Sequence, residues 1–89
     1  MLTLEMVKEK VNSVNRLFES KNLSSRFLLV KESEPSELGQ FRLRLGREEQ
    51  IKYGSYQMEL LRTNDLSSIV YDLDTLSKVI EFESLNGIL

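Results

Sequence analysis

The clearest strand signal in the chain runs over residues 40–46, which read Gln40-Phe41-Arg42-Leu43-Arg44-Leu45-Gly46. Phe41, Leu43 and Leu45 alternate with two arginines, and a period of two places the apolar side chains on one face of a strand. Such alternation is typical of an antiparallel strand with one buried face. The segment therefore predicts a sheet that is covered on its apolar side.

The segments on either side extend this sheet. Residues 26–31 form a short apolar run between serine-rich stretches, which predicts a strand. Because both its faces are apolar, we expect either cover on each side or an unusually apolar outer sheet face. Residues 51–58 change phase at Gly54-Ser55. The change indicates either a two-residue hairpin that pairs Tyr53 with Tyr56 and Ile51 with Met58, or a β-bulge within one long strand.

A helix is predicted on each side of these strands. The first covers about residues 4–21, after a capping Thr3, and its apolar residues recur every three or four positions: Leu4, Val7, Val11, Val14 and Phe18. The second begins after the capping cluster Thr63-Asn64-Asp65 and has Asn86-Gly87 near its end. Its apolar stripe comprises Leu66, Ile69, Val70, Leu73, Leu76 and Ile80.

The order of elements predicts one α+β domain over residues 1–89: a helix, an antiparallel meander of three or four strands, and a helix, with both helices on one face of the sheet. The length of 89 residues supports one core, and the 40% hydrophobic and 29% charged residues are typical of a chain that folds alone. The expected core comprises Val7, Val11, Val14, Phe18, Phe41, Leu43, Leu73, Leu76 and Ile80.

The composition excludes most kinds of catalytic site. The chain has no histidine and no cysteine, so catalytic triads, thiolate nucleophiles and zinc sites are excluded. We interpret Asp72 with Asp74, and Glu48 with Glu49, as solvated surface, and the dispersed glycines form no phosphate loop. We therefore expect no enzyme activity, no metal and no cofactor.

We expect no targeting signal. An acid at Glu5 stands where a signal peptide needs cations, and no apolar run approaches the roughly 20 residues of a membrane span. Without cysteines there is no sign of an oxidising compartment, so a cytoplasmic location and no membrane partner are expected. The net charge is −2, and residues 63–89 are acidic, with Lys78 alone against Asp65, Asp72, Asp74, Glu81 and Glu83.

The second helix is apolar on two sides. Helical spacing places five residues opposite its core stripe: Tyr71, Thr75, Lys78, Val79 and Phe82. Either this side contacts a protein partner, a homodimer being the simplest version, or its two aromatic rings tuck under residues 85–89 or against the first helix.

The sheet face away from the helices offers an alternative site. Arg42, Arg44 and Lys52 would lie there beside Leu28 and Val30, and a cationic face could bind nucleic acid through phosphate contacts. This alternative ranks below a protein partner because exposed strands routinely carry cations that oppose aggregation.

The chain resembles the small, uncharacterised α+β proteins of bacterial phages and plasmids. The resemblance lies in the helix–meander–helix order and in Tyr53-Gly54-Ser55-Tyr56 leading through Asn64-Asp65-Leu66 into a leucine-rich terminal helix. It implies a host-directed or phage-directed binding protein, or an inhibitor, and it carries no site residues across. The sequence as a whole favours a small protein-interaction module.

Overall fold

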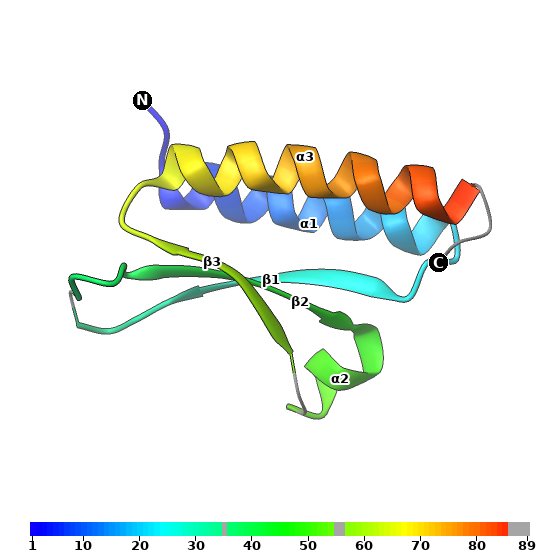
Figure 1. Cartoon of the computed structure of the whole chain (residues 1–89), viewed down its shortest axis with the longest axis horizontal. Coiled ribbons are helices and arrows are strands. Elements are labelled where there is room, and N and C mark those ends of the chain that lie inside the picture. Colours follow the sequence, from blue (N-terminus) through cyan, green and yellow to red (C-terminus); the bar gives the residue numbers. More distant parts are fainter. Residues whose placement is uncertain (35, 55–56, 86–89) are drawn as a thin grey trace.

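Two long helices and a three-stranded sheet form two layers. The computed structural model describes residues 1–34, 36–54 and 57–85. The elements, in order, are α1 (Leu4–Ser20), β1 (Ser25–Lys31), β2 (Phe41–Arg47), α2 (Glu48–Lys52), β3 (Met58–Thr63) and α3 (Leu66–Leu85). Figure 1 shows α1 and α3 side by side along one side of the sheet, with the short α2 on the other side.

The strands form an antiparallel meander in the order β1-β2-β3, which confirms the expected fold with three strands. Leu43 of the central strand stands opposite Leu29 of β1 and Leu61 of β3. The register between β2 and β3 shifts after Leu43, so the irregularity lies here and not at Gly54. As β2 is central, β1 and β3 are the two edges of the sheet.

The strand expected from residue 51 is wrong, because residues 48–52 form α2. Both the hairpin and the bulge required Ile51 to be extended. The helix is favoured locally since the Gln50 side chain accepts a hydrogen bond from the Arg47 backbone N–H at 2.8 Å, and acids in the first turn and Lys52 in the last suit the helix dipole. The expected pairing of Tyr53 with Tyr56 involves Ser55 and Tyr56, which lie outside the described residues.

The core lies between the helix layer and the sheet. Its buried side chains are Val7, Val11, Phe18, Phe27, Leu43, Ile69, Leu73 and Ile80. Three further residues of the expected core, Val14, Phe41 and Leu76, are half-buried and pack against it. The rings of Phe18 and Phe27 join α1 to β1 with their centres 5.8 Å apart. Every residue of the expected core therefore belongs to the core or its margin.

The two long helices run in the same direction and are tied by ion pairs (Figure 1). Lys10 lies 2.9 Å from Asp74. Nearer the C-terminal ends of both helices, Lys21 pairs with Glu81. The expected caps are present, since the Thr3 hydroxyl accepts from the Met6 N–H at 3.2 Å. Likewise an Asp65 carboxylate oxygen accepts from the Ser67 N–H at 3.0 Å. The helix end expected at Asn86-Gly87 lies outside the described residues.

Gly39 allows the connection between β1 and β2 to lie directly on the end of β3. Its φ is +120°, and a Cβ built there would stand 2.4 Å from the backbone nitrogen of Thr63. Its carbonyl oxygen accepts a hydrogen bond from the Arg62 side chain at 2.9 Å. Only glycine combines this backbone conformation with so close an approach.

Gly39→Ala should therefore lower the free energy of unfolding by about 3–4 kcal/mol, because strain and a backbone clash add. The matched control is Gly54→Ala, where φ is +69° but a Cβ would meet nothing within 4 Å. The control should cost about 1–2 kcal/mol from the left-handed conformation alone. Urea denaturation of both variants measures the difference, and equal costs would contradict the close approach at Thr63.

The centre of α3 can be tested in the same way. Leu73 is fully buried, so Leu73→Ala should cost about 2–5 kcal/mol through lost burial and a cavity. The matched control is Met6, which lies on α1 and is exposed, and Met6→Ala should change stability by no more than about 0.5 kcal/mol. A Leu73→Ala variant with the parent's denaturation midpoint would show that the core is assigned wrongly.

Candidate functional site

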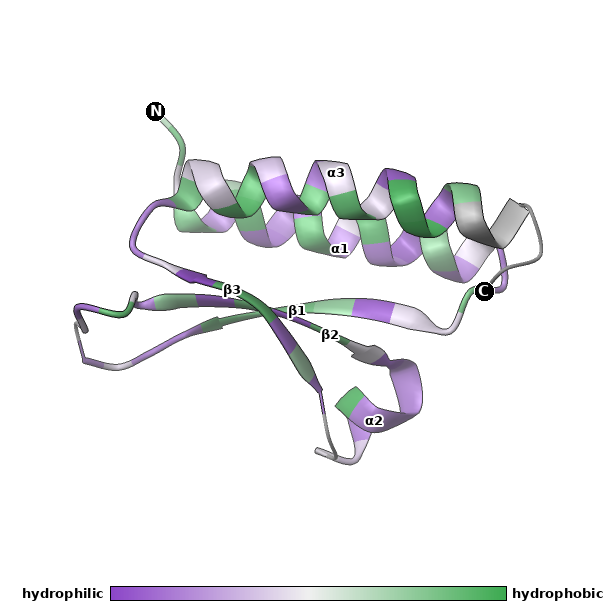
Figure 2. Ribbon diagram, viewed as in Figure 1, coloured by the Kyte–Doolittle hydropathy of each residue, from purple (hydrophilic) through white to green (hydrophobic). Residues whose placement is uncertain are grey.

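The outer side of α3 carries an exposed apolar stripe. All five residues expected there are exposed, and we call them the α3 stripe: Tyr71, Thr75, Lys78, Val79 and Phe82. The exposed fractions are 72% for Tyr71, 45% for Val79 and 64% for Phe82. Figure 2 shows hydrophobic residues recurring along the length of α3. The structure thus brings the expected residues together on one surface.

The competing interpretation placed the two aromatic rings against the chain itself. Their exposed fractions show that neither ring is buried against α1. The version in which they lie under residues 85–89 concerns side chains that the structure does not describe. Within the described residues, the α3 stripe faces away from the core.

The acids beside the α3 stripe are partly neutralised. Asp74 pairs with Lys10, and Glu81 pairs with Lys21, so residues of α1 and its C-cap neutralise two acids of α3. The acidic character of residues 63–89 therefore overstates the negative charge that a partner would meet on the helix layer.

The cationic sheet face does not form as expected. Arg42 donates to the Glu32 carboxylate at 2.6 Å and also to Glu59, so its charge is paired on both sides. Arg44 stands opposite Glu59 in the register, and its Nε is buried with no hydrogen-bond partner in the described part of the chain. Lys52 lies on α2 and not in a strand, which corrects its expected position.

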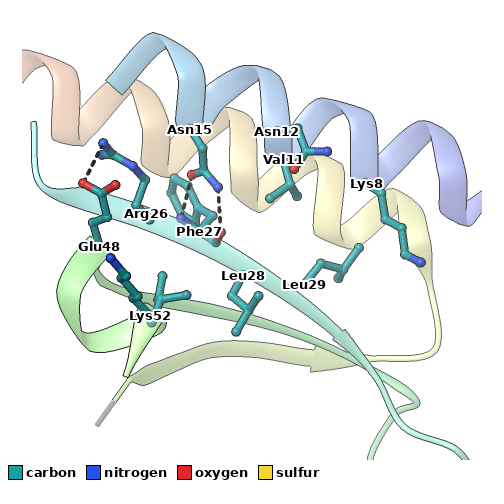
Figure 3. A pocket seen from close by; sticks show the side chains of 11 residues that line it. Lys8, Val11, Asn12, Asn15, Arg26, Phe27, Leu28, Leu29, Glu48 and Lys52 are labelled. Carbon is teal, nitrogen blue, oxygen red and sulfur yellow. Dashed lines mark hydrogen bonds and ion pairs between the residues drawn. The ribbon is translucent and has the colours of Figure 1, made fainter. Parts of the chain in front are cut away.

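A groove that the sequence did not reveal crosses the outer edge of β1. It has a volume of about 500 Å³ and lies between α1 and α2 (Figure 3). Its lining residues include Lys8 and Asn12 on α1, Leu29 on β1, and Ile51 and Lys52 on α2. Because α1 and α2 contact opposite sides of β1, the expected cover on both faces of this strand is present.

At one end of this β1 edge, the Asn15 side chain binds the main chain of Phe27 with a pair of hydrogen bonds. Its side-chain nitrogen donates to the Phe27 carbonyl oxygen, and its side-chain oxygen accepts from the Phe27 N–H, both at 2.8 Å (Figure 3). The amide of Asn15 thus offers β1 the same donor and acceptor as a neighbouring strand would. Nearby, Arg26 lies 3.5 Å from Glu48 and fixes α2 to β1.

Across residues 1–34, 36–54 and 57–85, acids do not gather in a group of three or more that could hold a metal ion. Among the helices of those same ranges, none combines the length and apolarity needed to cross a membrane.

The ion pair between Arg42 and Glu32 should make stability depend on pH. The hydrogen bond from Arg42 holds the pKa of the Glu32 carboxyl below its ordinary value of 4.5. A lowered pKa stabilises the fold above the ordinary value, and this stability is lost as pH falls through the folded-state pKa. Glu32→Gln should therefore flatten the fall in the free energy of unfolding from about pH 5 to pH 3.

Urea denaturation of parent and variant across this range measures the effect. Glu37→Gln is the matched control, because Glu37 is an exposed glutamate in the same connection with no ion pair in the described residues. If the two variants lose stability equally steeply on acidification, the Arg42–Glu32 pair contributes nothing to the fold.

Comparison with known proteins gives no relative from which a function could be inferred. No protein-family model matches the chain, and no curated protein or solved structure matches it either. The function must therefore be argued from the surfaces described above.

Proposed function

We propose that this chain is a protein-interaction module that acts by binding and not by catalysis, and that the α3 stripe is its contact surface. The observation that carries the proposal is the exposure of Tyr71, Val79 and Phe82 on one side of a single helix. Large apolar side chains gathered on one exposed face are uncommon in monomers and mark interaction sites. Aromatic residues also supply much of the energy of protein interfaces.

A second copy of the chain is the simplest partner. In a twofold interface each residue meets a partner residue that meets it in return. If two α3 helices cross antiparallel about their common midpoint, Tyr71 of one copy faces Phe82 of the other, and Thr75 faces Lys78. Both pairs share the same midpoint along the sequence, so the stripe is complementary to itself.

The charges near the stripe are compatible with this arrangement. Two acid-rich helices would repel one another, but Lys10 and Lys21 of α1 already pair with Asp74 and Glu81. Electrostatic repulsion between the copies is thereby reduced, and the aromatic contacts can stabilise the dimer.

The resemblance to phage and plasmid proteins suggests that the module is a binding protein or inhibitor that a phage or plasmid encodes, and that it acts in the cytoplasm. Nucleic-acid binding through Arg42, Arg44 and Lys52 is the alternative. It has less support because Arg42 is paired with two glutamates and Lys52 is not on the sheet face.

Sedimentation or light scattering at about 100 µM should show a dimer, and Tyr71→Glu with Phe82→Glu should give a folded monomer, because buried carboxylates oppose association. The matched control is Leu38→Glu with Tyr53→Glu, which changes two side chains of similar exposure, 71% and 77%, away from α3. The control should remain a dimer.

Two results would contradict this proposal. A monomeric parent protein would exclude the homodimer. Loss of the folded circular-dichroism signal in the Tyr71→Glu, Phe82→Glu variant, but not in the control, would show that the rings belong to the monomer's own core.

A further inference from the structure

We propose that the open edge of β1, within the groove between α1 and α2, binds an extended acidic peptide segment of a partner protein by strand addition. We call this surface the β1-edge groove. It is separate from the α3 stripe, and the proposal does not depend on whether the chain forms dimers.

The main-chain geometry of β1 shows which groups are available. The Phe27 N–H and carbonyl are bound by Asn15, so they point away from β2. Main-chain groups of alternate strand residues point the same way, so those of Leu29 and Lys31 also point outward. Consistent with this alternation, the Glu32 N–H points inward and donates to the Gln40 carbonyl of the β1–β2 connection at 2.8 Å. Since β1 is the edge of the sheet, no strand of the described residues lies beside these outward groups.

Asn15 sets the end of the accessible edge. Its amide already occupies the place of a neighbouring strand at Phe27, so an incoming strand can continue from that point along Leu29 and Lys31. Two N–H groups and two carbonyl oxygens then pair with the peptide. This is the hydrogen-bond pattern of peptides that add a strand to an exposed sheet edge.

The walls of the groove specify the side chains of the occupant. Successive side chains of an added strand point to opposite faces of the sheet, toward α1 on one side and α2 on the other. Lys8 lies on the α1 side and Lys52 on the α2 side (Figure 3). The nearest acid to Lys8 is Glu5 of the same helix, at 3.8 Å, and Lys52 lies 5.7 Å from the centre of the Tyr53 ring.

Charge therefore favours a peptide with acids on both faces. Three cations line the groove, Lys8, Arg26 and Lys52, against one acid, Glu48, which is already paired with Arg26. Apolar lining from Leu28, Leu29 and Ile51 suits aliphatic residues between the acids. The volume of about 500 Å³ lies within the range of sites that hold small ligands or short segments.

Two other occupants fit less well. A second copy paired through its own β1 would bring the Lys31 residues and the groove lysines of both copies together, and like charges in proximity oppose pairing. A single-stranded nucleic acid needs exposed aromatic rings for stacking, whereas the aromatic residue in the groove, Phe27, is buried.

The probe is the labelled peptide acetyl-Val-Glu-Val-Glu-Glu-Val-amide, which in a strand carries acids on both faces. Fluorescence anisotropy should show saturable binding to the parent protein, and the same peptide with lysine in place of each glutamate should bind at least tenfold more weakly. Hydrogen exchange by NMR should locate the site, with the amides of Leu29 and Lys31 slowed at least tenfold at saturating peptide.

Two kinds of variant test separately how main-chain hydrogen bonds and lysine charges contribute to peptide binding. Lys31→Pro removes an outward N–H, a change that edge strands tolerate, and should weaken binding at least tenfold. Lys52→Glu should also weaken it at least tenfold, whereas Lys78→Glu, which changes the net charge equally but lies on α3, should leave it within twofold. Tyr71→Glu with Phe82→Glu should also leave the peptide affinity within twofold of the parent's. A failure of the β1-edge groove proposal can therefore be distinguished from a failure of the α3 stripe proposal.

The proposal is overturned if the lysine peptide binds as tightly as the acidic one, or if the amides of Leu29 and Lys31 exchange at the same rate with and without peptide. It is equally overturned if Lys31→Pro dissociates a dimer of the parent, which would make a second copy the occupant. Displacement of the peptide by a single-stranded oligonucleotide would assign the groove to nucleic acid instead.

Discussion

The burial of Leu43 under two helices is the constraint on which the rest of the structure depends. Leu43 lies in the central strand and is fully buried, with Leu29 and Leu61 opposite it on the two flanking strands. One sheet face this apolar must be covered, and the core stripes of α1 and α3 cover it in parallel. This arrangement makes β1 and β3 the edges of the sheet and leaves the outer sides of the helix layer in solvent.

Both candidate surfaces follow from that packing. Because the Leu66–Ile80 side of α3 faces the sheet, its second apolar side is turned away from the sheet and is exposed as the α3 stripe. Because α1 lies on one side of β1 and α2 on the other, the edge of β1 becomes the base of a groove and not a bare strand. The two surfaces use different chemistry: aromatic side chains on the helix, and main-chain hydrogen bonds with lysines at the strand.

The distribution of charge in the fold differs from its distribution along the chain. Lys10 and Lys21 neutralise acids of α3, and Arg42 is held between Glu32 and Glu59. Several charges that suggested an acidic helix or a cationic sheet thus form ion pairs within the domain. Exposed pairs of this kind stabilise a fold only modestly, but they change what a partner meets on the surface.

Periodicity was enough to predict α1, α3, the first two strands, most of the core and the α3 stripe, because a repeat of two, or of three and four, indicates which face each side chain occupies. The buried Phe27 and Ile69 were missing from the expected core. The five residues 48–52 are too few to distinguish a strand repeat from a helical repeat. A hydrogen bond from the Arg47 backbone N–H to the Gln50 side chain favours the helix there. The β1-edge groove required tertiary structure. Asn15 and Phe27 are twelve residues apart, and Arg42 and Glu59 seventeen. Such pairs meet only once helix packing and strand register are set, and neither is encoded in a local pattern.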